Sequence, residues 1–449
     1  MVSKKRKFQY SKLDELKKDV RNRNLEVPFK HKTEVLEDSI PIGSSRAPNR
    51  LVANPMEGND ADKDGGPSSL TNRRYRRLAS GGSGVIWVEA TAVTRDGRSS
   101  PRQLLFNEQS VTAFRELVRE IKSNGRGPEG EAQEPYVVLQ LTHSGRHSSP
   151  DGHPAPVIAH HQELLDEKYE VIDPDYPVIS DEKLEDLKSE YIETAGLADE
   201  CGFDAVDIKA CHGYLIHELL ASFNRKNSRY GGESFEARTR FLLEIVKGVR
   251  EQNPHLDVTT RLNVYDHLPY PAGFGMKKDG SLTKDLSEPA RLIDKLTKSG
   301  INTINLAICN PYYNPYVERP FDSPVPGSTL PEEHPLDTIQ RNIRVTRKIS
   351  ELQPNINFIG TGYSWLREYF PNLGAALCDA GTIAGVGVGR ISLANPDYAN
   401  QLLSRGSLNR GDLCTTCSSC VQMLRKGVEV GCLTRDTEMY RASYRKTVT

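Results

Sequence analysis

Short apolar runs alternate along most of the chain with longer segments whose apolar residues recur every three or four positions. The short runs are typical of buried strands, and the longer segments are typical of amphipathic helices. Eight strands are expected, at Arg50–Pro55, Val85–Glu89, Tyr136–Leu141, Ala205–Ile208, Val258–Leu262, Thr303–Leu306, Asn357–Gly360 and Thr382–Val386. Each is followed by a predicted helix, at Leu70–Ala79, Ser110–Ser123, Asp181–Cys201, Phe235–Asn253, Glu288–Ser299, Leu336–Leu352, Trp365–Cys378 and Leu393–Leu403. Eight successive strand–helix pairs predict a (β/α)₈ TIM barrel of the α/β class.

The barrel is expected to occupy residues 41–405, between two shorter regions. Residues 1–40 are rich in charge and are predicted to form an arm with one helix around Lys12 to Asn22, and residues 406–449 form a cysteine-rich extension. Four connections are too long for structural turns, and we expect them to build a substrate cavity or an interface. They are Arg126–Pro135, Ser144–Pro177, Leu268–Leu286 and Tyr312–His334.

Charge and hydropathy narrow the classes of function. The 449 residues carry a formal net charge of -1, which argues against a nucleic-acid-binding role, and we interpret the short basic runs 4–7 and 73–77 as solvated surface. No stretch approaches 18 consecutive apolar residues, and the N-terminus has no apolar signal core. We therefore expect a cytoplasmic protein with no membrane partner. The sequence leaves open whether the protein forms a homo-oligomer.

Four of the eight cysteines crowd into the extension with the spacing C-x2-C-x2-C-x11-C, as Cys414, Cys417, Cys420 and Cys432. Three thiolates at two-residue gaps can wrap one face of a cubane, and a remote fourth can close it. Structural zinc usually takes two separated pairs of cysteines, and a disulfide framework suits a secreted protein better than this scattered distribution. The spacing favours a [4Fe–4S] cluster over zinc, and zinc over disulfides.

The segment after the fourth strand carries a group of proton-handling side chains. Lys209 ends a strand in which Asp207 shares its face, and His212 and Tyr214 follow in the loop. Catalytic groups of barrel enzymes lie at such strand ends. A buried Lys–Asp ion pair, with the histidine and the tyrosine serving only in packing, is the alternative that the segment alone leaves open.

Two glycine-rich loops follow the last two strands, at 360–363 and 385–389, and the second ends in Arg390. Loops in this position of a barrel often bind phosphate, because glycine lets the backbone approach an anion. A G-x-G-x-x-G pattern at 125–130 is not a dinucleotide fingerprint, since it precedes a strand and Pro128 removes a backbone donor.

Several motifs together resemble the old yellow enzyme family of flavin oxidoreductases. They are 49–56 (NRLVANPM), 88–93 (VEATAV), 140–146 (QLTHSGR), 212–215 (HGYL), 227–232 (NSRYGG), Arg261 and Gly389–Arg390. With the cysteines included, the chain most resembles the iron–sulfur branch typified by 2,4-dienoyl-CoA reductase and trimethylamine dehydrogenase. The printed chain ends soon after Cys432, without that branch's second flavin and nicotinamide domains, so we expect a separate electron-donor protein or NAD(P)H to supply electrons.

The resemblance implies a barrel that holds FMN. Pro55, Met56 and Ala90 would line the isoalloxazine, Gln140 would bond its pyrimidine edge and Arg261 would lie near N1 and O2, where a cation favours the reduced flavin. Gly362, Gly389 and Arg390 would hold the phosphate. The alternative is that Gln140 and Arg261 have no cofactor role and only fill the mouth of the barrel as polar side chains.

These inferences together predict an FMN-dependent ene-reductase that reduces the C=C bond of an unsaturated carbonyl or carboxylate, with electrons supplied through the cluster. Lys209 and His212 would hold the substrate oxygen, and Tyr214 would protonate the α-carbon. Most relatives carry His or a comparable group in place of Lys209, so in this chain one donor to the substrate oxygen is a permanent cation or a partner of Asp207. The alternatives are an amine demethylase, which Lys209 disfavours by charge repulsion, and a non-redox binding barrel with a zinc tail.

Overall fold

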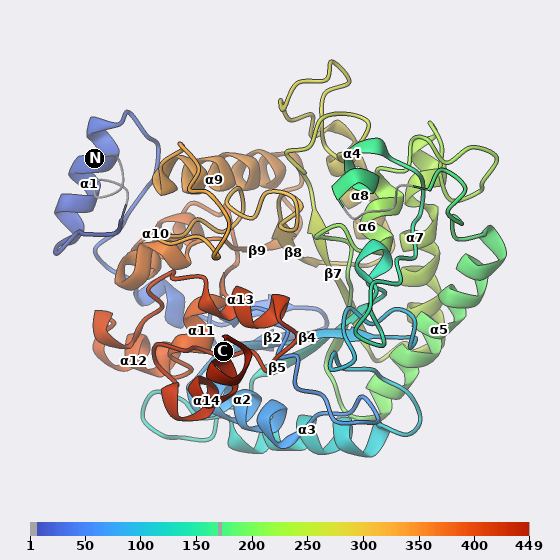
Figure 1. Cartoon of the computed structure of the whole chain (residues 1–449). Coiled ribbons are helices and arrows are strands. Elements are labelled where there is room, and N and C mark those ends of the chain that lie inside the picture. Colours follow the sequence, from blue (N-terminus) through green and yellow to red (C-terminus); the bar gives the residue numbers. More distant parts are fainter. Residues whose placement is uncertain (1–6, 169–172, 449) are drawn as a thin grey trace.

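The computed structural model describes residues 7–168 and 173–448 and contains a closed barrel of eight parallel strands in the order β10-β3-β4-β5-β6-β7-β8-β9 (Figure 1). The strands are β3 (Leu51–Ala53), β4 (Val85–Ala92), β5 (Tyr136–Thr142), β6 (Ala205–Ile208), β7 (Asp257–Asn263), β8 (Thr303–Ala307), β9 (Asn357–Gly360) and β10 (Gly385–Val388). The predicted TIM barrel is confirmed. The last strand begins three residues later than expected, at Gly385.

Helices surround the barrel near the predicted positions. The outer helices are α2 (Ser69–Ser80), α3 (Val111–Asn124), α5 (Asp181–Glu200), α7 (Phe235–Gln252), α8 (Ser287–Lys298), α9 (Pro335–Leu352), α10 (Phe370–Asp379) and α12 (Tyr398–Arg405). Short helices α4 (Glu163–Lys168), α6 (Leu215–Leu220) and α11 (Arg390–Ala394) lie in the connections.

Two helices predicted as continuous are interrupted. The segment 365–378 starts as the 3₁₀ turn η4 (Ser364–Tyr369), because Arg367 adopts a positive φ of 50°, and α10 begins only at Phe370. The segment 393–403 is divided between α11 and α12 around Pro396. Proline has no N–H to donate and disfavours a helical conformation in the residue before it, which explains the second break.

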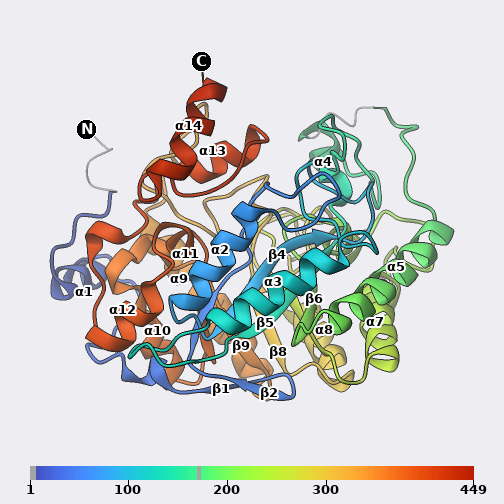
Figure 2. The same cartoon turned by 90° about the horizontal axis from the view of Figure 1, so that it is seen from below.

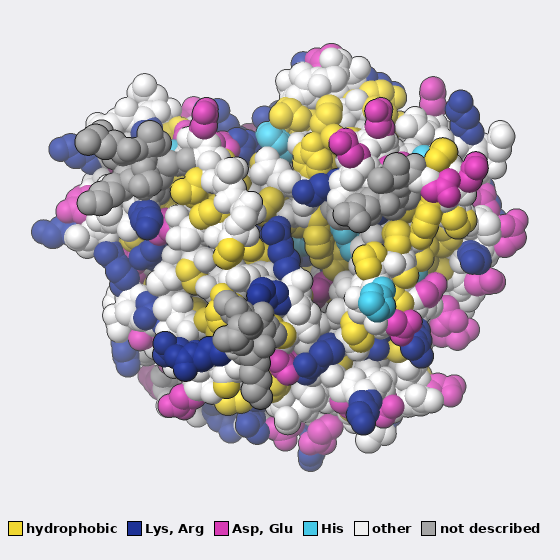
Figure 3. Space-filling model, in the orientation of Figure 1, with side chains coloured by type: hydrophobic (Ala, Val, Ile, Leu, Met, Phe, Trp, Pro, Cys, Tyr) yellow, Lys and Arg dark blue, Asp and Glu magenta, His cyan; other side chains and the backbone are white. Residues whose placement is uncertain are grey.

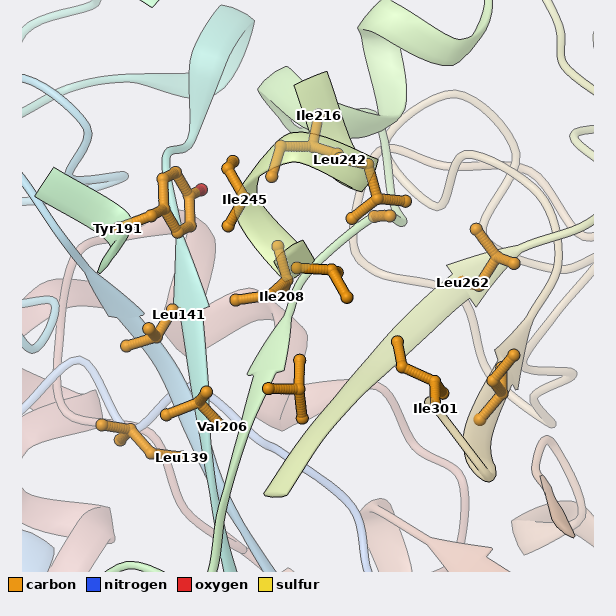
Figure 4. Close-up of a cluster of buried hydrophobic side chains, with 14 of the residues drawn as sticks. Leu139, Leu141, Tyr191, Val206, Ile208, Ile216, Leu242, Ile245, Leu262 and Ile301 are labelled. Carbon is orange, nitrogen blue, oxygen red and sulfur yellow. The ribbon is translucent and has the colours of Figure 1, made fainter. Parts of the chain in front are cut away.

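Apolar side chains between the strands and the outer helices form the main core (Figure 4). Leu139, Leu141, Val206, Ile208 and Leu262 project from the strands and pack near residues of the helices. Burying each of these side chains contributes about 1.5–3 kcal/mol, so this layer fixes the strand positions from which the site is built.

The two ends of the barrel differ (Figure 2). At one end, the hairpin of β1 (Ile40–Ile42) and β2 (Ser45–Ala47) buries Ile40 and Ile42 against strand residues such as Trp87. At the opposite end lie α13 (Ser419–Arg425) and α14 (Thr437–Val448) of the cysteine-rich extension. The three-residue strands of the hairpin give too little periodic pattern to be predicted.

The N-terminal residues that the structure describes pack on the barrel. In α1 (Leu13–Asn22), Leu16 and Val20 are buried in one cluster with Trp365 and Phe370. The backbone N–H of Phe8 donates to Asp322 at 3.1 Å. Within the described residues, no helix has the length and apolar character needed to cross a membrane.

Candidate active site

A cavity of about 370 Å³ opens at the carboxyl ends of the barrel strands. The predicted non-cysteine site residues all line it: Pro55, Met56, Ala90, Gln140, Lys209, His212, Tyr214, Arg261, Gly362, Gly389 and Arg390. Of the four tail cysteines, Cys420 also lines the cavity, together with its neighbour Val421. Figure 3 shows the face that carries α13 and α14, with several Lys and Arg side chains (dark blue) around its middle.

Asp207 forms a polar anchor inside the barrel below the cavity. It is fully buried and accepts hydrogen bonds from Trp87 Nε1 at 2.8 Å, from Gln140 Nε2 at 2.6 Å and from the backbone N–H of Arg261 at 2.6 Å. Burial raises the pKa of Asp207, and these three donors oppose the rise. Asp207 therefore orients Gln140 and the Arg261 backbone.

Lys209 pairs with a different carboxylate, Glu57, which follows Met56 in the loop after β3. The Lys209 Nζ lies 3.7 Å from Glu57 Oε1 and 3.4 Å from the centre of the Tyr214 ring. Burial lowers the pKa of Lys209, and the charge of Glu57 opposes this. The alternative in which Lys209 forms an ion pair with Asp207 does not occur in the structure.

Tyr214 connects this pair to a second tyrosine. Its hydroxyl donates to Glu57 Oε1 at 2.7 Å and lies 3.2 Å from the Tyr312 hydroxyl. The Tyr312 ring stacks on His147 with centroids 3.9 Å apart. Burial, followed by the charge of Glu57, raises the pKa of Tyr214 well above its ordinary value, so the phenol keeps its proton at neutral pH.

His212 lies beside a second carboxylate. Its Nε2 is 3.3 Å from Glu318 Oε1, and the same oxygen accepts from Arg261 Nη2 at 3.2 Å. Burial lowers the pKa of His212 to about 4 although Glu318 opposes the shift, so the imidazole is neutral at pH 7. Burial disfavours the Glu318 charge, but His212, Arg261 and Arg319 overcome it and lower the pKa of Glu318 to about 2.

The loops after β9 and β10 bring close-packed backbone and a buried cation to the cavity. Gly362 has a φ of +94°, and a Cβ there would lie 2.5 Å from Asn342 Nδ2. A Cβ on Gly389 would lie 2.5 Å from the Met56 sulfur. Arg390 is buried, and among the described residues no carboxylate forms an ion pair with it. Burial lowers the pKa of Arg390, so an anionic ligand would stabilise this guanidinium.

Within the described residues, no disulfide joins Cys414, Cys417, Cys420 or Cys432 to another cysteine. Burial and the neighbouring thiols Cys414 and Cys417 raise the pKa of Cys420 to about 12 and that of Cys432 to about 11. Thr416 lies between Cys414 and Cys417, and Ser418 lies between Cys417 and Cys420. Both have positive φ values, of 54° and 62°. Within 7–168 and 173–448, no three His, Cys, Asp or Glu side chains are placed to hold a single metal ion.

Comparison with known proteins places the chain in a family. Residues 38–301 match the model of the NADH:flavin oxidoreductase / NADH oxidase family. The chain belongs to this family. It is 32% identical over 252 residues to NADPH dehydrogenase of Listeria monocytogenes, covering 53% of this chain and 69% of the relative. Members of this family use FMN, so the protein is an FMN-dependent oxidoreductase.

Two solved structures share the fold at lower identity. A 2-naphthoyl-CoA reductase complex aligns over 90% of this chain with a TM-score of 0.68 and 18% identity, and this chain spans 57% of that chain. The old yellow enzyme homologue from Zymomonas mobilis aligns over 84% of this chain and 94% of its own, with a TM-score of 0.60 and 19% identity.

The cavity residues fit the family's cofactor. In the described part of the chain no carboxylate pairs with the buried Arg390, which lines the cavity together with Gly362 and Gly389. Arg261 has a buried Nε without a hydrogen-bond partner, beside the Gln140 that Asp207 holds. A flavin bound here would supply acceptors for these donors.

The sequence reasoning missed cavity residues that come from loops. Glu57, His147, Tyr312, Glu318 and Arg319 line the cavity. Glu57 immediately follows the quoted 49–56 motif, so its place beside Pro55 and Met56 was a usable signal. The others lie in the long connections 144–177 and 312–334, whose paths follow no periodic pattern. The connections 126–135 and 268–286 contribute no residue to this cavity.

Proposed function

We propose that this protein is an ene-reductase that reduces the C=C bond of an α,β-unsaturated carbonyl or carboxylate substrate. The observation that carries the proposal is the convergence of Lys209, His212 and Tyr214 on the cavity that also contains the predicted flavin residues. Bound FMN supplies the hydride for the substrate β-carbon. The residues of this chain have to hold the substrate oxygen and deliver a proton.

The geometry suits these two tasks. Lys209 and the neutral His212 are donors on the same loop, and a cation next to a directional donor stabilises negative charge that develops on a substrate oxygen. Tyr214 keeps its proton at neutral pH and is available as a general acid. A carboxylate substrate would gain more from Lys209 than a neutral ketone would.

We further propose that Cys414, Cys417, Cys420 and Cys432 hold a [4Fe–4S] cluster through which electrons reach the flavin site. In such a cluster each thiolate binds its own iron, so the four sulfurs need not converge on one point. Support comes from the mutual influence of the thiols and from the position of Cys420 in the cavity wall. The electrons would come from a separate carrier protein or from NAD(P)H, the reductants of family members.

Amine oxidation, with electrons flowing from substrate to flavin, is the second candidate. The Glu57 carboxylate 3.7 Å from Lys209 offsets the lysine charge and weakens the repulsion of a cationic amine. The direction of electron flow therefore decides between the two candidates.

The test is a pair of anaerobic stopped-flow mixtures. Dithionite-reduced, FMN-loaded protein should be reoxidised by 2-cyclohexenone or cinnamate, and NMR should show the saturated product. Oxidised protein mixed with trimethylamine should stay oxidised. Rapid bleaching of the flavin by the amine, with no reoxidation by either alkene, would replace the ene-reductase proposal by the amine reaction.

The cluster has its own test. Iron, acid-labile sulfide and zinc are counted after anaerobic purification, and four irons per chain are expected. Zinc alone would contradict the cluster and leave the flavin chemistry untouched.

A further inference from the structure

The charged side chains that line the cavity do not balance. Among the described residues, two carboxylates line it, Glu57 and Glu318, against five cations: Lys209, Arg261, Arg319, Arg390 and Arg425. His147 and His212 add no charge at neutral pH, because burial lowers their pKa to about 3 and to about 4. The cavity therefore has more positive than negative charge before any ligand enters.

Both carboxylates are already occupied by cations. Glu57 Oε1 lies 3.7 Å from Lys209 Nζ. Glu318 Oε1 accepts from Arg261 Nη2 at 3.2 Å. Three cavity cations are left over, and in the part of the chain that the structure describes no carboxylate forms an ion pair with any of them: Arg319, Arg390 and Arg425.

Two of these three cations suit the flavin phosphate. Burial lowers the pKa of Arg390 and the charge of Arg319 adds to this, while the Cys414 and Cys420 thiols oppose it. Arg319 and Arg390 are thus near enough to repel each other. A phosphate monoester carries up to two negative charges at neutral pH and would neutralise both. Arg425 is the cation that the flavin site leaves unassigned.

Arg425 comes from the cysteine-rich extension and lies toward the substrate side of the cavity. It is the last residue of α13, which also brings Cys420, Val421 and Leu424 to the cavity wall. Burial and the charge of Glu57 raise the pKa of Tyr312, and Arg319 and Arg425 oppose the rise, so both guanidiniums lie near the Tyr312 phenol. The Tyr312 hydroxyl is 3.2 Å from that of Tyr214, the proposed proton donor.

We propose that Arg425 binds an anionic group that the substrate carries away from its double bond. The substrate is then an α,β-unsaturated carbonyl compound that also has a carboxylate. Lys209 and His212 hold the carbonyl oxygen, and Arg425 holds the carboxylate at the rim of the cavity, because a guanidinium presents paired N–H donors that match the two carboxylate oxygens. This inference rests on the proposed ene-reductase reaction and makes Arg425 a specificity-determining residue.

The first test compares two enones that differ only in charge, benzylideneacetone and its derivative with a carboxylate in the para position of the ring. Each is titrated at pH 7 into oxidised, FMN-loaded protein, and the dissociation constant is taken from the change in flavin absorbance. The wild type should bind the carboxylate about three- to tenfold more tightly than the neutral enone, since the ion pair is partly exposed. The ratio of the two constants is internally normalised, so a general weakening of binding does not imitate the effect.

Three variants assign this preference to a residue. Arg425→Gln should bring the ratio to about one, and Arg425→Lys should keep part of it, because lysine retains the charge without the paired donors. Lys426→Gln is the matched control. Lys426 is the next residue, is exposed and does not line the cavity, so its loss removes the same unit charge and should leave the wild-type ratio.

The phosphates of a nicotinamide dinucleotide are the competing anions for Arg425. Reduction of the FMN-loaded protein by NADH and by NADPH, measured over a range of concentrations in anaerobic stopped flow, separates the two. If Arg425→Gln weakens the binding of either dinucleotide and leaves the ratio for the enones unchanged, the residue serves the electron donor and the proposal is overturned.

The outcomes also separate the anion site from the reaction on which it rests. Equal affinity of the wild type for both enones, while both reoxidise the reduced flavin, overturns the anion site and leaves the ene-reductase reaction standing. A preference that Arg425→Gln abolishes and Lys426→Gln keeps supports the site. If that preference is found but neither enone reoxidises the reduced flavin, the ene-reductase assignment fails and the anion site stands.

Discussion

Removal of the Lys209 ammonium tests both the ion pair with Glu57 and the proposed contact with substrate. At 3.7 Å, two unit charges attract by about 4.5 kcal/mol at an effective dielectric constant of 20. The cost of taking both charges out of water offsets much of this, because the Lys209 side chain is only 4% exposed. Lys209→Met should nevertheless lower the free energy of unfolding by roughly 3–5 kcal/mol, since it leaves a buried carboxylate without its cation.

A double-mutant cycle separates the two roles. Glu57→Gln removes the stranded charge, so Lys209→Met/Glu57→Gln should recover stability relative to Lys209→Met alone, with a coupling energy of roughly 0.5–3 kcal/mol. Stability is measured by urea unfolding at pH 7 on the flavin-free protein. In the FMN-loaded protein, the double variant should still transfer hydride to 2-cyclohexenone about a hundredfold more slowly than Glu57→Gln, because one oxyanion donor is missing.

Two results would refute this reasoning. Strictly additive losses of stability would show that Lys209 and Glu57 do not interact in the folded protein. An unchanged hydride-transfer rate in the double variant, relative to Glu57→Gln, would show that Lys209 is a structural counter-ion that never contacts substrate.

Further predictions concern the cofactors and the acid range. Cys417→Ala should lose iron and sulfide yet retain FMN in a ratio near that of the wild type, because the barrel supplies the flavin site; parallel loss of FMN would contradict this. Gly362→Ala should lower the melting temperature and weaken FMN binding measured by flavin fluorescence, since alanine at a φ of +94° costs roughly 1–3 kcal/mol. The melting temperature should fall between pH 7 and pH 5, because burial lowers the pKa of His160 to about 3 and that of His212 to about 4. Below the unfolded value near 6.5 the unfolded chain binds more protons, so stability rises with pH there, and a flat profile would contradict the burial of neutral imidazoles. NADH mixed alone with the FMN-loaded protein should reduce the flavin slowly, and rapid reduction in stopped flow would remove the need for a carrier protein.

The sequence by itself determined the elements of the barrel, because their apolar periodicity reflects burial that is local to each element. It also determined the candidate residues at strand ends, since parallel strands in a barrel bring their carboxyl ends to one face. Lys209 could be placed at that face on this argument alone, whereas Gln140 and Arg261 were singled out by the resemblance to the old yellow enzyme family.

Only the tertiary structure decided which charged groups face each other. From the sequence, Lys209 could pair with Asp207 two residues away or with an acidic residue elsewhere in the chain. In the structure, Asp207 accepts hydrogen bonds from Trp87, Gln140 and the backbone N–H of Arg261. Glu57, from a different strand end, pairs with Lys209 instead. Glu318 likewise reaches His212 from a loop more than a hundred residues away. Such pairs depend on side-chain directions across strands distant in sequence, and neither periodicity nor spacing along the chain records those directions.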